Sequence, residues 1–271
     1  MANYSFFPQV RSDRAVISLH GNEALVFLQN LLTCDVGNLD AGDARYGALL
    51  SPQGKIQHDF FVYNDGAGIL LDCAREQRAG LIQKLTLYRL RAKLDITVRD
   101  DLEIIVGEDG YVDPRDPTMG RRMFAVAGRF AEGKGYDATR ISAGLADSVL
   151  DIGSNILFPH EANLDQWQGI SFSKGCYVGQ EVVSRMEHRG TARSRILPIV
   201  CNPDAPSKGT QILSGQKSIG EVLSSSGDLA LALIRLDRLA EVVAPLVAGT
   251  SGVTVKRPDW AKYEVVQHAS S

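Results

Sequence analysis

Two strand-like runs joined by a tight turn constrain the fold of this chain more than any other feature of its sequence. Residues 44–50 and 55–63 are dominated by apolar and aromatic side chains. The intervening segment 51–54 reads Ser-Pro-Gln-Gly, and its proline and glycine suit a short hairpin turn. The two runs therefore predict a pair of antiparallel strands.

Strand and helix patterns alternate through the rest of the first 150 residues. Alternating or short apolar runs predict strands at residues 14–20, 67–73, 94–98, 102–106 and 121–127. Apolar residues at helical spacing predict helices at residues 21–32, 81–88 and 138–150. Because strands outnumber helices and both are mixed along the chain, we expect an α+β fold in which helices cover one face of a largely antiparallel sheet.

Changes in composition predict the domain organisation. Residues 107–120 are rich in Gly, Pro and Asp and are predicted to form a surface loop between two sub-domains. After Gly190, short strand patterns separated by turns predict a small β-barrel, with strands at residues 195–200, 211–213, 219–224 and 229–236. We therefore place one domain at residues 1–192 and a barrel domain at residues 193–271.

Size and charge narrow the classes of partner. The chain has 271 residues, 44% of them hydrophobic, which suffices for one large domain or two ordinary ones. Its formal net charge of −3 predicts no direct binding to nucleic acid and no attraction to an anionic membrane. No apolar run has the length of a membrane span, and residues 1–14 resemble neither a signal nor a transit peptide. These features predict a cytoplasmic protein.

The four cysteines, Cys34, Cys73, Cys176 and Cys201, are widely scattered. Without a Cys-x-x-Cys pair or a Cys/His cluster, they predict neither a disulfide framework nor a stably bound metal, and we expect all four thiols to be reduced. Cys34 and Cys73 have apolar surroundings that indicate the core. His160 has no second histidine at metal-binding spacing and is expected to be an incidental surface residue.

Residues 170–190 hold most of the chemical signal. Gly175 and Gly179 flank Cys176, which suits a backbone that turns sharply or lies against a ligand where a Cβ would clash. Apolar residues recur at helical spacing after Gly179, so Cys176 is predicted to lie just before a short helix. A thiol at a helix N-terminus, beside the cation of Lys174, can be held as the reactive thiolate. A single cysteine can also be an inert small hydrophobic residue, and that alternative stays open.

Residues 174–181, Lys-Gly-Cys-Tyr-Val-Gly-Gln-Glu, resemble the signature of the YgfZ family, folate-binding relatives of the glycine-cleavage T-protein that serve iron–sulfur proteins. They fit the family form Lys-Gly-Cys-aromatic-x-Gly-Gln-Glu throughout, and we call them the signature. The similarity extends to residues 27–35, 46–51, 159–164 and 218–233. It implies a T-protein-like folate-binding domain followed by a C-terminal β-barrel.

The resemblance also implies roles for individual residues. The reactive groups would be Cys176 and Lys174. Tetrahydrofolate would be bound by Asp59, which corresponds to the acidic residue of the family's folate pocket, and by Tyr177, Gln180, Glu181 and Arg185. Considered without the family, Asp59 is an acid in an apolar strand that needs a partner or a function, or else a residue on the solvent face. The basic residues after the signature indicate a solvated face or a site for the glutamate carboxylates of folate: Arg185, Arg189, Arg193 and Arg195.

The function implied by the resemblance is assistance in the assembly or repair of iron–sulfur clusters in client enzymes, including those of tRNA modification. The partners would be folate and iron–sulfur client or carrier proteins, and the chain would not be a classical enzyme. The alternative is an aminomethyltransferase or another folate-dependent one-carbon transferase, which would need the folate pocket but not the thiol of Cys176. A folate carrier or sensor is a third possibility.

Overall fold

The computed structural model describes residues 8–133, 135–190 and 192–266. The chain forms two compact units and passes between them several times. The first unit comprises Met1–Lys134, Ser154–Ile156 and Trp167–Val182, and the second comprises Gly135–Gly153, Leu157–Gln166 and Val183–Ser271. No helix among the described residues is both long enough and apolar enough to cross a membrane.

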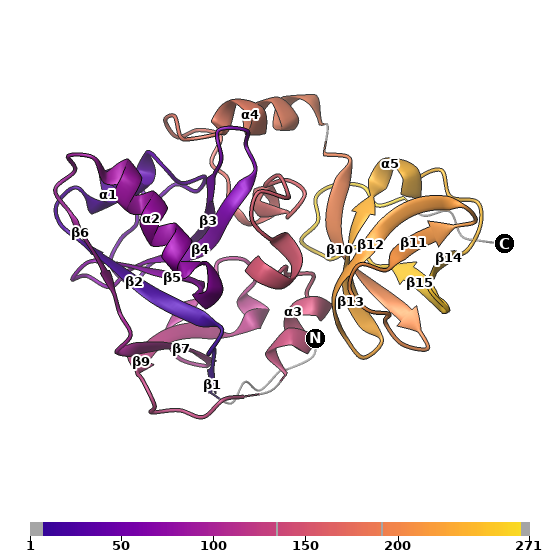
Figure 1. Ribbon diagram of the computed structural model, residues 1–271, viewed down its shortest axis with the longest axis horizontal. Coiled ribbons are helices and arrows are strands. Elements are labelled where there is room, and N and C mark those ends of the chain that lie inside the picture. The colour runs from indigo at the N-terminus through magenta and orange to yellow at the C-terminus, as the bar shows by residue number, and fades with distance from the viewer. Residues whose placement is uncertain (1–7, 134, 191, 267–271) are drawn as a thin grey trace. The chain divides into compact units, whose positions relative to one another are not determined.

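A five-stranded antiparallel sheet is the centre of the first unit (Figure 1). In spatial order its strands are β3 (Ala44–Leu50), β4 (Ile56–Asn64), β5 (Ile69–Ala74), β2 (Arg14–His20) and β6 (Asp95–Val98). The predicted hairpin is confirmed, because β3 and β4 pair antiparallel from Ala44 opposite Tyr63 to Leu50 opposite Ile56. Gly54 in the turn has a φ of +79°, which glycine adopts without strain.

Two helices pack on this sheet, α1 (Ala24–Gln29) and α2 (Arg78–Arg89), the second preceded by a 3-10 turn at Arg75–Gln77. Leu28 of α1 and Leu85 of α2 share one apolar cluster with strand residues such as Leu71. Burial of each such side chain stabilises the fold by roughly 1.5–3 kcal/mol. The first helix was predicted to reach residue 32, but the amide of Leu31 already bonds to the carbonyl of Leu28, three residues back, and the helix ends in a tighter turn.

A four-stranded antiparallel sheet completes the first unit, in the order β1 (Gln9–Val10), β7 (Leu102–Gly107), β9 (Arg121–Val126) and β8 (Tyr111–Val112). The runs at 94–98 and 102–106 are neighbours in sequence but do not pair with each other, because β6 pairs with β2 and β7 pairs with β9. Residues 107–120, predicted as a surface loop, contain β8 and a 3-10 turn at Pro117–Met119. Asp113 in this segment is buried, because Arg115 neutralises its charge with a 2.9 Å ion pair.

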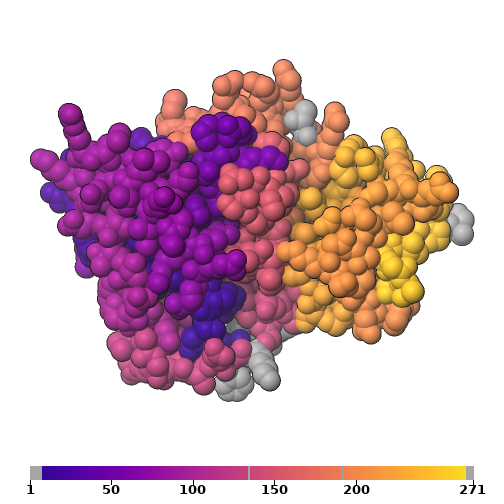
Figure 2. All heavy atoms as spheres, in the orientation of Figure 1, coloured from indigo at the N-terminus to yellow at the C-terminus, as the bar shows by residue number. Residues whose placement is uncertain are grey.

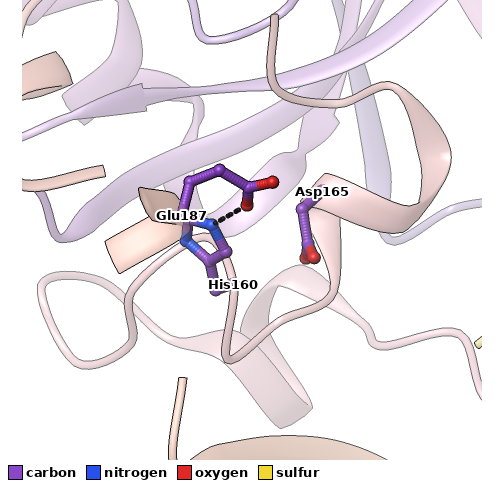
Figure 3. Close-up of side chains that lie close together, drawn as sticks. All are labelled: His160, Asp165 and Glu187. Carbon is purple, nitrogen blue, oxygen red and sulfur yellow. Dashed lines mark hydrogen bonds and ion pairs between the residues drawn. The ribbon is translucent and has the colours of Figure 1, made fainter. Parts of the chain in front are cut away.

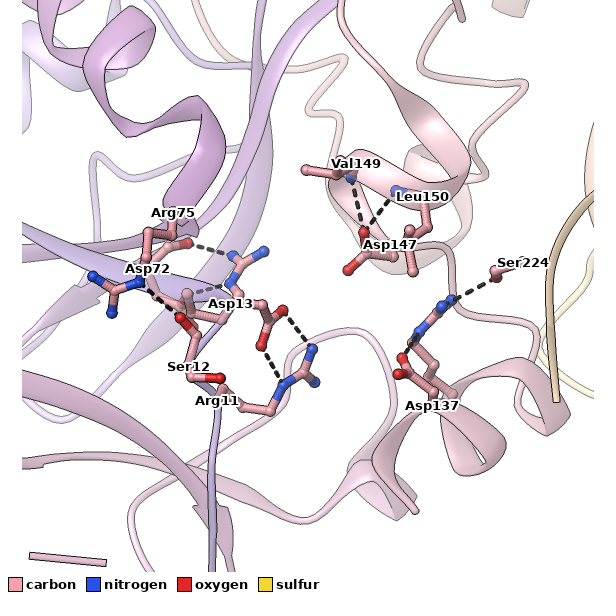
Figure 4. Close-up of polar contacts among 12 residues, drawn as sticks. Arg11, Ser12, Asp13, Asp72, Arg75, Asp137, Asp147, Val149, Leu150 and Ser224 are labelled. Atoms are coloured by element: carbon pink, nitrogen blue, oxygen red, sulfur yellow. Dashed lines mark hydrogen bonds and ion pairs between the residues drawn. The ribbon is translucent and has the colours of Figure 1, made fainter. Parts of the chain in front are cut away.

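Asp72 on β5 connects the two sheets of the first unit. Its carboxylate accepts a 2.6 Å hydrogen bond from Arg14 of β2 and another of 2.6 Å from Arg122 of β9. All three side chains are buried, so the ion pairs form in a medium of low dielectric, where an unpaired charge is very costly. Asp72 is labelled in Figure 4.

The second unit begins with helix α3 (Tyr136–Ser142). A continuous helix was predicted over 138–150, but the helix ends before Gly144, which has a φ of +78°. A π-helical turn at Ser148–Ile152 follows. The carboxylate of Asp147 caps this turn by accepting hydrogen bonds from its first amides (Figure 4).

The second unit also contains a closed antiparallel barrel (Figure 1). Around the barrel the strands are β10 (Ser194–Asn202), β13 (Leu229–Arg235), β12 (Lys217–Ser226), β11 (Gln211–Ser214), β14 (Leu246–Ala248) and β15 (Ser251–Val255). A short helix, α5 (Leu236–Leu239), follows β13. The barrel prediction is confirmed, although the sequence did not indicate β14 and β15, which are only three and five residues long.

Helix α4 (Gln180–Arg189) starts within the signature and ends before Gly190, which has a φ of +56°. Cys176 therefore lies four residues before a short helix, as predicted from the glycines and the apolar spacing. Most side chains of α4 are exposed or half-buried, and they lie at the molecular surface, in salmon at the top of Figure 2.

Candidate functional site

The signature loop is held against the segment that follows α1. The hydroxyl of Thr33 donates a 2.6 Å hydrogen bond to the carbonyl of Gly169, and the amide of Ser171 donates to the carbonyl of Thr33 at 2.8 Å. Thr33 is fully buried, so these bonds exchange little with water. The approach to Cys176 is therefore fixed by residues more than 130 positions earlier in the chain.

Lys174 connects the signature to the same segment. Its ammonium donates hydrogen bonds to the main-chain carbonyls of Leu32 (2.6 Å) and Cys34 (2.8 Å), and it lies 5.2 Å from the ring centroid of Tyr177. Burial lowers the pKa of Lys174 from its ordinary value. The sequence suggested Lys174 as the cation beside Cys176, but the ammonium is directed to the carbonyls at the end of the α1 turn. Cations commonly satisfy carbonyls of this kind.

Cys176 differs from the other three cysteines in exposure. The thiol of Cys176 is exposed, whereas Cys34, Cys73 and Cys201 are buried, and all four are free. Burial raises the pKa of Cys34 to about 11 and that of Cys73 to about 12, and it also raises the pKa of Cys201. The predicted core positions of Cys34 and Cys73 are thus confirmed. Among the four thiols, Cys176 is the one that a reagent or a partner protein can reach.

Two glycines allow the signature to lie against the β3–β4 turn. A Cβ on Gly179 would stand 2.6 Å from the carbonyl oxygen of Ser51, and a Cβ on Gly54 would stand 2.9 Å from the Cβ of Val182. Both distances are too short for real atoms, so glycine is required at each position. Gly175 differs, because a Cβ there would meet no atom within 4 Å of the described structure.

Asp59 lies on β4 in an aromatic environment. Its Oδ2 accepts a 2.8 Å hydrogen bond from the hydroxyl of Tyr46 on β3, and the carboxylate is only 2% exposed. The ring of Tyr46 lies 6.4 Å from that of Trp167, and the guanidinium of Arg115 lies 5.1 Å from the Tyr46 ring. Burial, and next the charge of Asp59, raise the pKa of Tyr46 well above its ordinary value. The solvent-face alternative for Asp59 is therefore wrong.

The sequence did not reveal the two arginines that lie over the ring of Phe61, two residues after Asp59. The guanidinium of Arg122 lies 4.3 Å from the ring centroid of Phe61, and that of Arg115 lies 4.7 Å from it. Cations over an aromatic face are attracted by the ring quadrupole. The pattern Asp113-Pro-Arg115 in the supposed surface loop was the one available signal, since an acid and a base two residues apart can pair.

The other residues proposed for folate are divided between buried and exposed positions. Tyr177 is buried, and within the described residues its hydroxyl has no hydrogen-bond partner. Gln180 is half-buried, whereas Glu181 and Arg185 are exposed on α4. The structure thus brings Tyr177 into contact with Lys174, and Asp59 into contact with Tyr46. The basic stretch is not one solvated face, because Arg195 is buried and forms a 2.5 Å ion pair with Asp165.

A groove of about 470 Å³ opens beside the signature in the first unit. The side chain of Phe172, which lines this groove, is 43% exposed. Charged and polar groups surround it, and the complete lining is Asp35, Arg45, Gln168, Ile170, Ser171, Phe172 and Ser173. A mixed apolar and charged groove next to an exposed thiol suits a segment of another protein better than a small apolar molecule.

Comparisons with known proteins agree with this architecture. The glycine cleavage system aminomethyltransferase T from Bartonella henselae has the same fold, with a TM-score of 0.73 over 94% of this chain and 86% of that one, at 15% identity. Residues 193–263 match the family model of the CAF17 C-terminal beta-barrel domain. The chain therefore has a T-protein-like fold with a CAF17-type C-terminal barrel.

Relatives identify the family within this class. The mitochondrial iron–sulfur cluster assembly factor IBA57 homolog of Pyricularia oryzae is 30% identical over 86% of this chain and 72% of its own length. Human mitochondrial IBA57 is 26% identical over 91% of this chain and 83% of its own length. The chain belongs to the IBA57 family. Because these relatives are mitochondrial proteins, the predicted cytoplasmic location is wrong.

Proposed function

We propose that this protein assists the assembly or repair of iron–sulfur clusters in client proteins, and that Cys176 is the group that acts on the cluster or on its carrier. The exposure of this thiol, in contrast to the three buried ones, is the observation that carries the proposal. Thiolates are the usual protein ligands of iron–sulfur clusters, and a ligand that transfers a cluster must be reachable by the partner. The family relationship and the YgfZ-like signature support the same role.

The groove beside the signature would receive the client or carrier protein. Phe172 offers an apolar anchor there, and Arg45 and Asp35 offer charges of both signs. Interfaces of transient complexes combine such an anchor with a polar rim. Cys176 then lies on the same loop as the anchor, so docking would bring the partner to the thiol.

The test is activity of a client iron–sulfur enzyme in cells that lack this protein and receive either the natural chain or a variant. Cys176→Ala is expected to abolish the rescue. Ser207→Ala changes an exposed residue in the loop after β10, outside the signature and the groove lining, and is expected to rescue fully. Full rescue by Cys176→Ala, at equal protein level, would show that the thiol has no such role.

Tetrahydrofolate binding is the second part of the proposal. A buried carboxylate among aromatic rings, as at Asp59, suits the donor edge and the flat face of a pterin, and Tyr177, Gln180 and Glu181 would contribute further contacts. The exposed guanidinium of Arg185 suits the glutamate carboxylates. When bound, tetrahydrofolate supplies a carrier for one-carbon groups. Asp59 would hold and orient it, and Tyr46 would keep Asp59 in place.

Calorimetry with tetrahydrofolate tests this part separately. Asp59→Asn is expected to weaken binding at least tenfold, or about 1.4 kcal/mol. Asp109→Asn, a change at an exposed acid, is the matched control and is expected to bind normally. Unchanged affinity in Asp59→Asn would remove Asp59 from the site.

A folate-dependent transferase is the alternative that the fold favours, because the structural neighbour is an aminomethyltransferase. A transferase needs the folate site but not the thiol. Cys176→Ala should therefore abolish a role in cluster assembly but leave a transferase active. Retained one-carbon transfer by this variant would favour the transferase.

A further inference from the structure

Three side chains with metal-binding atoms meet in the second unit: His160, Asp165 and Glu187. Their ligand atoms all lie within 4.8 Å of one another. Figure 3 shows Glu187 reaching the imidazole of His160, with Nε2 and Oε2 3.0 Å apart, and Asp165 beside them. The three residues come from the loop after Leu157, from the turn at Leu164–Trp167 and from the last turn of α4, so no local sequence motif announces them.

Two side chains of the cluster are buried and the third is exposed to solvent. His160 is 1% exposed, so its prediction as a surface residue is wrong. The side chain of Asp165 is 7% exposed, whereas that of Glu187 is 46% exposed. Burial of the first two groups fixes their rotamers, and the exposure of Glu187 gives an ion a path from solvent.

Arg195 holds two of the three groups in position. Its guanidinium donates to both oxygens of Asp165 (2.5 and 3.0 Å) and to the main-chain carbonyl of His160 (2.6 Å). The guanidinium is itself fixed 4.4 Å from the ring centroid of Tyr263. Ligands of protein metal sites are commonly oriented by such outer hydrogen bonds, which reduce the entropy lost when the ion binds.

The charge of the cluster favours a cation in spite of Arg195. Two carboxylates and one guanidinium give a net charge of −1 when the imidazole is neutral. Each carboxylate oxygen has two lone pairs, so Asp165 can accept from Arg195 and bind an ion at the same time. The donor set is one imidazole nitrogen and two carboxylates, with no sulfur, which suits Zn²⁺, Fe²⁺ or Mn²⁺.

We propose that His160, Asp165 and Glu187 bind one divalent transition-metal ion, with water completing its coordination. Ligands at about 2.1 Å from a tetrahedral ion are about 3.4 Å from one another. The 3.0 Å separation of Nε2 and Oε2 is already close to this value, and rotation of the exposed Glu187 side chain can adjust the rest. His160 binds through Nε2 as the neutral tautomer that carries its proton on Nδ1. The ion would fix the last turn of α4 to the loop of His160.

Calorimetric titration of the metal-free, full-length protein with Zn²⁺ tests the proposal. The natural chain is expected to bind one equivalent. Glu187→Gln keeps the shape of a largely exposed side chain and is expected to weaken binding by at least about tenfold. His188→Gln changes the next residue of α4, which is also exposed, and is expected to bind Zn²⁺ as the natural chain does.

Two further measurements locate the bound ion. Cys176→Ser removes the exposed thiol that could bind Zn²⁺ by itself, and this variant is expected to retain the one-equivalent site. Co²⁺ bound to the natural chain is expected to show no thiolate-to-metal charge-transfer band. Absence of one-equivalent binding, affinity unchanged in Glu187→Gln, or binding lost in Cys176→Ser would each overturn the proposal.

Discussion

The ammonium of Lys174 lies 2.8 Å from the main-chain carbonyl oxygen of Cys34, 140 residues earlier in the chain. Together with its bond to Leu32, this contact fixes the loop that presents Cys176. Lys174 therefore positions the thiol through the backbone. This differs from direct electrostatic activation, which the sequence had suggested.

Lys174→Met should expose this positioning role. The variant keeps the length of the side chain but leaves two carbonyls without their charged donor, and we expect a loss of about 1–3 kcal/mol in the free energy of unfolding. Lys93→Met, at an exposed position, is expected to change it by less than about 0.5 kcal/mol. Urea denaturation measures both. Equal stability of the two variants would contradict the role.

Alanine substitutions should destabilise the protein more at the buried cysteines than at the exposed Cys176. Cys34→Ala and Cys73→Ala leave small cavities in the core of the first unit and are expected to cost about 1–2 kcal/mol each. Cys176→Ala removes an exposed atom and is expected to cost less than about 0.5 kcal/mol while abolishing the rescue of client enzymes. The measurement is urea denaturation beside the rescue assay. If Cys176→Ala were strongly destabilised, its loss of function would be explained by misfolding and not by the missing thiol.

Alkylation should also rank the four thiols. With a pKa of about 11, Cys34 is a thiolate in roughly one molecule in a thousand at pH 8. Cys73 is ionised still less, and burial hinders access to both. We expect iodoacetamide to modify Cys176 first in the native protein, with site-resolved rates read by mass spectrometry. A native rate for Cys34 equal to that of Cys176 would be inconsistent with the structure.

His58 on β4 should make stability fall in mild acid. Burial lowers its pKa in the folded state, so the unfolded chain binds the proton more readily. As pH falls through the unfolded pKa near 6.5, the unfolded state is favoured, and the loss continues until the folded pKa is reached. His58→Gln should reduce the difference in unfolding free energy between pH 7.5 and 5.5. An unchanged difference in His58→Gln would contradict this account.

The sequence predicted those strands and helices whose geometry depends on residues that are neighbours in the chain. The β3–β4 hairpin follows from apolar runs on either side of a Pro-Gly turn, and the start of α4 follows from Gly179. Contacts between distant residues were not predictable in this way. The burial of Asp113 depends on Arg115 and Arg122, and a composition rich in Gly, Pro and Asp indicates a loop without showing which acid is buried.

In the candidate site too, the features set by neighbouring residues were predictable, whereas those set by distant residues were not. The position of Cys176 just before a helix followed from its glycines and from the apolar spacing after Gly179. The exposure of its thiol and the partners of Lys174 came from the structure, because they depend on where distant segments lie. His160 gave no signal because its partners Asp165 and Glu187 come from other segments. The roles of Asp59, Tyr177 and the other proposed folate ligands remain predictions for calorimetry.

Asp72 has a consequence for how the first unit opens. It accepts from Arg14 on one sheet and from Arg122 on the other, so separation of the sheets would break the buried ion pair between Asp72 and Arg122. Partial opening of either sheet alone is therefore costly, and the most protected amides of β2, β5 and β9 should exchange with deuterium through a single shared event. The ion pair between Asp72 and Arg122 can add little to net stability and still make the two sheets unfold as one cooperative unit.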